Sequence, residues 1–154
     1  MSIEALQVRM PDLIERLSGT EQDVARRLTG VFEEAGEELF LVGGVVRDLL
    51  LDRGGADLDF ATSADPEQTK KLGIRAGADS FYDVGQAYGT IGLVFHQKSG
   101  DAPELTIEIT TYRSEVYPTR DRRPAVQHDV SLAEDLSRRD FTINAIALNA
   151  LTGD

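Results

Sequence analysis

The sequence of 154 residues contains no cysteine, which excludes disulfide bonds and thiolate metal sites. Its two histidines, His96 and His128, stand apart and lack the spacing of metal ligands. No apolar run is long enough to span a membrane, and the first residues lack the basic and apolar regions of a signal peptide. These absences favour a cytoplasmic protein that does not contact a membrane. The length fits one domain with a hydrophobic core.

Positive charge is also scarce, with 16 Lys and Arg against 27 Asp and Glu and a net charge of −11. Such a chain repels polyanions overall, whereas RNA-binding surfaces are normally basic. The last third nevertheless concentrates six arginines: Arg113, Arg120, Arg122, Arg123, Arg138 and Arg139. They either form one local basic wall facing a nucleotide and an RNA end, or pair on the surface with neighbouring acids. The available acids are Asp121, Glu134, Asp135 and Asp140.

The most informative segment, LVGGVVRDLLLDRGGADLDFAT, runs from Leu41 to Thr62. Gly43 and Gly44 follow an apolar strand pattern and precede a short helical pattern. A glycine turn before a helix offers backbone N–H groups and the positive end of the helix, which suit a phosphate chain. The segment therefore predicts a phosphate-binding turn.

Two aspartates, Asp57 and Asp59, flank Leu58 in the second apolar run of this segment. Residues two apart on a strand share a face, so both carboxylates should lie side by side with Leu58 turned to the core. Neighbouring carboxylates repel unless a cation lies between them, and oxygen ligands suit Mg²⁺. Glu108 is a third candidate, because it alternates with two isoleucines in another strand pattern. It is either a third metal ligand or an exposed acid on an edge strand.

Local patterns predict the order of the elements. Residues 10–35 are helical with a break at 18–20, where Thr20 is the expected N-cap of the second piece. Asp65 with Pro66 should begin a helix, and Ser131 with Glu134 fits a capping box. Residues 113–129 have the composition of a loop. Strand patterns cover residues 38–42, 81–84, 90–96 and 105–112, and a final apolar run covers 143–149.

Four ordered stretches resemble the catalytic head of the class II tRNA nucleotidyltransferases and bacterial poly(A) polymerases, within the DNA polymerase β superfamily. They are Gly43-Gly44-x-x-Arg47-Asp48 with Asp57-x-Asp59, Gly85-x-x-Tyr88-Gly89-Thr90, Glu108-x-Thr110-Thr111-Tyr112-Arg113, and Arg138-Arg139-Asp140-Phe141-Thr142-Ile143-Asn144-Ala145. The basic loop departs from the family's usual Asp-Gly-Arg-Arg-Pro, because Arg120-Asp121 stands before Arg122-Arg123-Pro124.

The resemblance implies an α/β (α+β) fold with a mixed, mostly antiparallel sheet of about five strands and helices on one side. It divides the chain into an N-terminal helical segment, residues 1–37, that packs on a head domain, residues 38–154. The chain is expected to be a fragment, because a helical neck, body and tail normally follow the head in this family.

The resemblance also implies a site. Asp57 and Asp59 would hold Mg²⁺, which Mn²⁺ can replace, with Glu108 as the third catalytic carboxylate. The expected nucleotide-binding residues are Gly43, Gly44, Arg47, Arg138, Arg139 and Asp140. The expected contacts to RNA or phosphate are Arg113, Arg122 and Arg123. Asp48 is expected to be an internal hydrogen-bond partner.

The implied activity is transfer of nucleotides from CTP and ATP to the 3′ end of tRNA, either as CCA addition or as CC or A addition. Two alternatives remain open on the sequence. The first is the head of a bacterial poly(A) polymerase, which shares these motifs. The second is a module that binds a nucleotide or a metal without catalysis.

Overall fold

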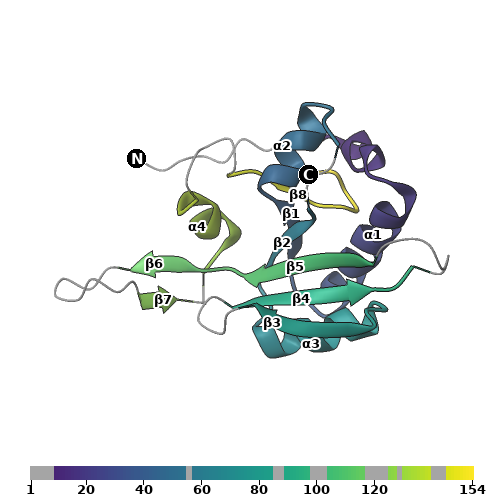
Figure 1. Ribbon diagram of the computed structural model, residues 1–154. Helices are drawn as coiled ribbons and strands as arrows, with labels where there is room; N and C mark the ends of the chain where they lie inside the picture. Colours follow the sequence, from purple (N-terminus) through teal and green to yellow (C-terminus); the bar gives the residue numbers. More distant parts are fainter. Residues whose placement is uncertain are drawn as a thin grey trace.

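The computed structural model of the protein describes residues 9–54, 57–84, 89–97, 104–116, 125–127, 130–139 and 145–154. The helices are η1 (Pro11–Arg16, a 3-10 helix), α1 (Gly19–Glu34), α2 (Gly44–Leu50), α3 (Pro66–Arg75) and α4 (Leu132–Ser137). The strands are β1 (Leu39–Val42), β2 (Asp59–Thr62), β3 (Ser80–Val84), β4 (Thr90–Phe95), β5 (Leu105–Thr111), β6 (Ser114–Val116), β7 (Ala125–Gln127) and β8 (Ala147–Leu148). Figure 1 shows their arrangement.

The main sheet has the strand order β3-β4-β5-β2-β1-β8. All its neighbouring strands pair antiparallel except β2 and β5, which are parallel. The expected mixed and mostly antiparallel sheet is therefore confirmed. Six strands form it rather than about five, because the short β8 adds to the free edge of β1. The predicted loop at 113–129 is partly wrong, since β6 and β7 pair there as a two-stranded ribbon.

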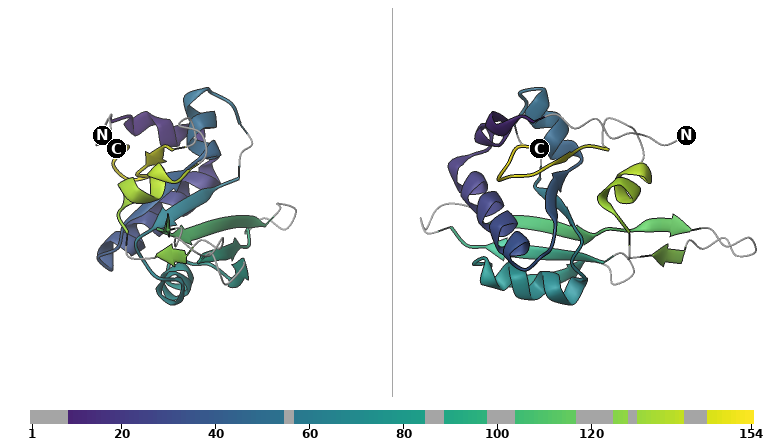
Figure 2. Two further views of the ribbon diagram at one scale, coloured as in Figure 1. Left: turned by 90° about the vertical axis from the view of Figure 1, so that its left-hand side faces the viewer. Right: turned by 180° about the vertical axis from the view of Figure 1, so that it is seen from behind.

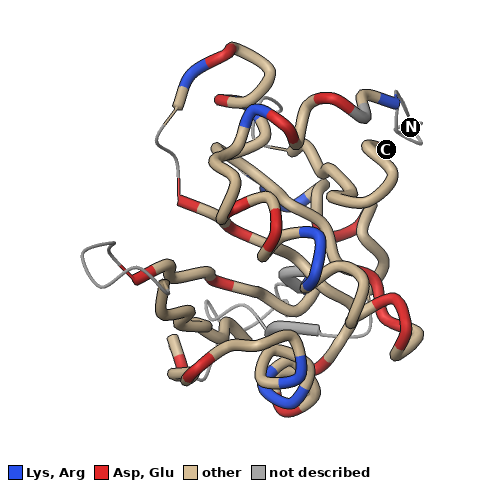
Figure 3. Tube along the Cα trace, turned by 90° about the vertical axis from the view of Figure 1, so that its right-hand side faces the viewer, with Lys and Arg blue, Asp and Glu red and all other residues tan. Residues whose placement is uncertain are grey.

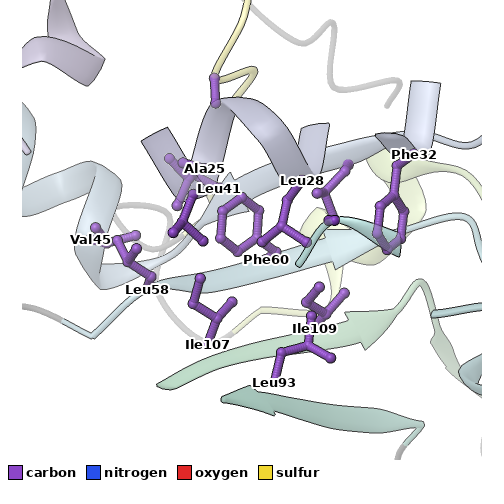
Figure 4. Close-up of a cluster of buried hydrophobic side chains, with 14 of the residues drawn as sticks. Ala25, Leu28, Phe32, Leu41, Val45, Leu58, Phe60, Leu93, Ile107 and Ile109 are labelled. Atoms are coloured by element: carbon purple, nitrogen blue, oxygen red, sulfur yellow. The ribbon is translucent and has the colours of Figure 1, made fainter. Parts of the chain in front are cut away.

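One face of the sheet carries the main hydrophobic core. Leu28 and Phe32 of α1 pack in one cluster with Leu41, Phe60 and Ile107 of the central strands, and all five are at most 1% exposed. Figure 4 shows these side chains meeting between the helix and the sheet. Burying each large apolar side chain contributes roughly 1.5–3 kcal/mol. Helix α1 shares this core and so packs on the sheet, while the division of the chain into a segment 1–37 and a head domain 38–154 stays a prediction.

Helices α1, α2 and α3 contribute side chains to that core, as expected from helices on one side of the sheet. Helix α4 lies on the opposite side of strands β3–β5 from α3 (Figures 1 and 2). It belongs to a second, smaller cluster, in which Leu132 packs against Val42, Ala61 and Tyr112. Within the described part of the chain, α4 and this cluster thus cover only part of the sheet face opposite the core.

Local capping signals explain where three helices begin. Asp65 caps α3 by accepting from the Gln68 N–H, and Ser131 with Glu134 forms the predicted capping box of α4. The prediction of Thr20 as N-cap of α1 is wrong. Ser18 takes that position, because its backbone is still extended and its side chain and that of Glu21 form a reciprocal capping box.

Candidate active site

Asp59 and Glu108 lie opposite each other on adjacent strands at the centre of the sheet. The parallel register of β2 and β5 pairs these two residues directly. Leu58 and Phe60 are 2% and 1% exposed, so the alternation of β2 turns the Asp59 side chain to the face away from the core. Ile107 and Ile109 on β5 are also buried, so the Glu108 side chain between them turns to the same face as Asp59. Since β5 pairs with β4 and β2, Glu108 does not stand on an edge strand.

Asp57 precedes β2 and is exposed, with buried Leu58 between it and Asp59. Partial burial raises the pKa of Asp59, and the negative charges of Glu108 and Asp57 raise it further. The positive charge of Arg139 acts in the opposite direction. The three predicted carboxylates therefore lie within electrostatic range of one another, with a guanidinium nearby.

This arrangement has the donor chemistry of a Mg²⁺ site. Among the described residues, no group of three or more His, Cys, Asp or Glu side chains forms a ready metal cage. Mg²⁺ does not require one, because it is usually held by one or two carboxylates together with water and substrate phosphates. The oxygen-only donors Asp57, Asp59 and Glu108, whose charges repel one another in the absence of a cation, fit that mode of binding.

The raised pKa of Asp59 gives a pH-dependent prediction for the metal-free protein. A folded-state pKa above the unfolded value means that ionised Asp59 destabilises the fold above that pKa, and the penalty disappears as protonation occurs on acidification. Asp59→Asn should therefore increase the free energy of unfolding at neutral pH, by less than about 1 kcal/mol because solvent reaches the partly buried side chain and screens the repulsion. The gain should shrink as the pH falls toward the unfolded value of 3.8. Urea unfolding of both proteins across pH in EDTA measures it, and equal stability at neutral pH would contradict it.

The glycine turn follows β1. Gly43 has φ 73° and ψ −138°, a backbone conformation that favours glycine, and it is the N-cap of α2. A Cβ on Gly43 would lie 3.9 Å from Nη1 of Arg139, and one on Gly44 would lie 3.4 Å from Nη2 of Arg47. Two guanidinium groups therefore lie beside the turn. The Nε of Arg47 donates to Oδ1 of Asp48 at 3.1 Å, so Asp48 is an internal partner, as expected.

Asp135 organises the arginines of the site. It is 1% exposed and accepts hydrogen bonds from Nη2 of Arg138 at 3.3 Å, from Nη2 of Arg139 at 3.1 Å and from the Arg113 N–H at 3.0 Å. Nε of Arg138 also donates to the carbonyl oxygen of Arg113 at 3.1 Å. Arg138 and Arg139 thus form a local basic group and also pair with an acid, as the two alternatives from the sequence had it. The acid, Asp135, is buried rather than on the surface.

From the sequence, Asp135 is expected only as a possible surface partner of the arginines. Its spacing of three and four residues from Arg138 and Arg139 is the signal for pairing along a helix. Its burial depends on α4 packing over the end of β5, which no local pattern indicates.

A cavity of about 330 Å³ brings these elements together. Its lining residues are Val42, Asp59, Phe60, Val84, Thr90, Glu108, Thr110, Arg113, Arg138 and Arg139. Five predicted site residues are among them, while Asp57, Gly43, Gly44 and Arg47 do not line it. Asp140, Arg122 and Arg123 lie outside the described residues. The volume falls within the range of small-molecule sites, and the combination of acids with arginines suits a metal-bound polyphosphate.

Acidic and basic residues are distributed unevenly along the described chain. Acidic positions recur throughout the described segments, whereas Lys and Arg occupy fewer short stretches (Figure 3). No helix in the described part of the chain has the length and apolarity required to cross a membrane.

Solved structures of CCA-adding enzymes resemble this fold. An apo form superimposes with a TM-score of 0.79 and 27% identity, covering 96% of this chain and 34% of that chain. The Bacillus stearothermophilus enzyme in complex with CTP gives a TM-score of 0.68 and 33% identity, covering 89% of this chain and 29% of that one. The Thermotoga maritima enzyme complexed with tRNA gives a TM-score of 0.71 and 26% identity, covering 96% of this chain and 32% of that one.

Curated sequences are more similar still. The CCA-adding enzyme of Streptococcus agalactiae is 47% identical over 118 residues, which are 76% of this chain and 26% of the relative. That of Leuconostoc citreum is 48% identical over 117 residues, 75% of this chain and 26% of the relative. The chain thus spans about a quarter of the length of these relatives. The family model of the poly A polymerase head domain matches residues 39–154, which contain every predicted site residue. With its fold, its carboxylate pair and these matches in agreement, the chain belongs to the poly A polymerase head domain family.

Proposed function

We propose that this chain is the catalytic head of a metal-dependent tRNA nucleotidyltransferase, which adds nucleotides from CTP and ATP to the 3′ end of tRNA. The observation that carries the proposal is the pairing of Asp59 with Glu108 beside a cavity lined by Arg113, Arg138 and Arg139. Similarity to CCA-adding enzymes solved with CTP, ATP and tRNA supports this choice of substrates. The site of action would be the cytoplasm.

Each group in the site has a role in this proposal. Asp57, Asp59 and Glu108 would hold Mg²⁺, which when bound lowers the pKa of the attacking hydroxyl and neutralises charge on the triphosphate. Arg138 and Arg139, fixed by Asp135, would neutralise and orient the phosphates. Gly43 and Gly44 bring backbone close to the same region, with Arg47 beside them.

The reaction joins a nucleotide to the RNA end and releases pyrophosphate. The 3′-hydroxyl of the RNA gives up its proton to water, and its oxygen forms a bond with the α-phosphorus. The bond between that phosphorus and the α–β bridging oxygen breaks, and pyrophosphate leaves with that oxygen. The chain's contribution is to hold both reactants in line and to balance the negative charge of the phosphates. This local balance explains how a protein with net charge −11 can take anionic substrates at one place.

An incorporation assay tests the proposal. The full-length natural protein is incubated with Mg²⁺, labelled CTP and ATP, and a tRNA transcript that lacks its terminal CCA. We expect addition that stops after at most three nucleotides, and none when EDTA removes the metal. A long adenylate tract would instead identify a poly(A) polymerase, and binding of nucleotide without any transfer would identify a non-catalytic module. Gel electrophoresis of the labelled RNA separates these outcomes.

A further inference from the structure

A row of four residues crosses the open face of the sheet through the carboxylate pair. The register pairs Tyr82 with Gly92, Gly92 with Glu108, and Glu108 with Asp59. Paired residues on neighbouring strands point to the same face, so the Tyr82 side chain lies on the face that carries the carboxylates. Tyr82 stands on the edge strand β3, and its side chain forms no hydrogen bond or ion pair with the described residues.

Gly92 allows the Tyr82 ring to lie across the sheet. A Cβ at Gly92 would overlap the ring, with Cζ as its nearest atom, so the hydroxyl end of the ring reaches over the backbone of β4. Tyr82 is nevertheless 42% exposed. One ring face is therefore pressed on the glycine while much of the side chain remains accessible. Adjacent strands are about 4.8 Å apart, so the ring lies one strand spacing from Glu108, within reach of a single nucleoside held there.

The position of the arginines assigns this ring to one substrate. Arg139 lies beside Gly43, at the end of β1. Tyr82 lies on β3, and the strands that carry Asp59 and Glu108 lie between β3 and β1 in the sheet. In-line transfer requires the attacking oxygen and the leaving pyrophosphate to be on opposite sides of the phosphorus. With the triphosphate held on the arginine side, the RNA end must approach from the β3–β4 side.

We propose that Tyr82, supported by Gly92, is the stacking surface for the base of the 3′-terminal nucleoside of the RNA acceptor. The proposal rests on the nucleotidyltransferase function proposed above and adds a subsite to it. Stacking on an aromatic ring tolerates any base, because every base has a π-face. Such a surface suits an acceptor whose terminal base is not the same at every addition. It also gives affinity for RNA without positive charge, which this acidic chain has in short supply.

The test compares steady-state kinetics of the full-length protein and three variants, with the tRNA lacking CCA and with CTP as substrates. Tyr82→Ala should raise the KM for the tRNA on the order of tenfold, the lower part of the range for loss of one base–aromatic stack. The KM for CTP should not change. Tyr82→Phe, which keeps the ring, should rescue the KM for the tRNA. Phe81→Ala is the matched control, because Phe81 is 45% exposed on the same strand but contacts Lys70.

A modified acceptor gives a second readout, and its first part uses the wild-type protein alone. A tRNA whose 3′-terminal nucleotide lacks its base should show a raised KM with the wild-type protein, and Tyr82→Ala should cause no further rise with this acceptor. An unchanged KM for tRNA in Tyr82→Ala, equal effects of the abasic acceptor on both proteins, or a rise in the KM for CTP alone would overturn the stacking proposal. Absence of transfer by the wild-type protein would instead overturn the proposed function.

Discussion

Replacing Asp59 with asparagine is expected to lower the rate of nucleotide transfer by a factor on the order of 10³ or more. Asp59 is the residue that the sheet register places directly opposite Glu108, and both line the cavity. An amide has nearly the same shape as the carboxylate but no charge, so the variant would hold Mg²⁺ weakly and lose the positive charge that balances the triphosphate, while the fold is kept. The loss should appear in kcat, because charge redistributes most in the transition state. Asp57→Asn should behave in the same way.

Initial rates of CTP incorporation by the full-length protein measure this effect. Asp83→Asn is the matched control, since it removes one aspartate charge from the same sheet. Asp83 pairs in register with the buried Ile91 and bonds to Lys70, which puts it on the face away from the carboxylates. The control should keep the wild-type rate. A near-normal rate in Asp59→Asn would mean that this carboxylate has no part in catalysis.

Replacing Asp135 with alanine is expected to destabilise the protein by about 3–5 kcal/mol, the usual cost of removing one partner of a buried ion pair. Asp135 is 1% exposed, and the side chains of Arg138 and Arg139 are only 16% and 19% exposed. Without the carboxylate, both guanidinium groups and the N–H of Arg113 lose an acceptor inside the protein. The arginines would also lose their fixed orientation at the cavity.

Urea denaturation of the 154-residue chain measures the change in the free energy of unfolding. Glu34→Ala is the comparison variant, because it breaks the Arg75–Glu34 pair at 3.4 Å, in which both side chains are at least 60% exposed. Such an exposed pair contributes about 0–1 kcal/mol. An Asp135→Ala transition midpoint equal to that of Glu34→Ala would show that the buried acid does not stabilise α4 against the sheet.

The features that could be predicted from sequence are those fixed by neighbouring residues. The alternation of Leu58, Asp59 and Phe60 indicated which side chains leave the core, and the structure agrees. The capping box at Ser131 follows from residues three apart. The turn at Gly43 could be predicted because its positive φ is a conformation that only glycine adopts readily. Each is a local rule that holds before tertiary contacts are known.

Other features depend on pairing between distant segments. The parallel pairing of β2 with β5 joins residues far apart in sequence, and a shift by one residue would turn Glu108 into the core. The β6–β7 ribbon formed in a segment with loop-like composition, because the strands satisfy each other's backbone groups. The fit of Tyr82 over Gly92 also required the register between β3 and β4.

The most direct test of the metal site at Asp59 and Glu108 is a titration of the chain with Mn²⁺ in the presence of CTP, followed by electron paramagnetic resonance of the free ion. Mn²⁺ is used because it can replace Mg²⁺ at oxygen ligands and has its own signal. We expect the wild-type chain to deplete free Mn²⁺ beyond the amount that CTP alone binds, and Asp59→Asn to lose this excess. Equal depletion by both proteins would contradict the assignment of the carboxylate pair as the metal site.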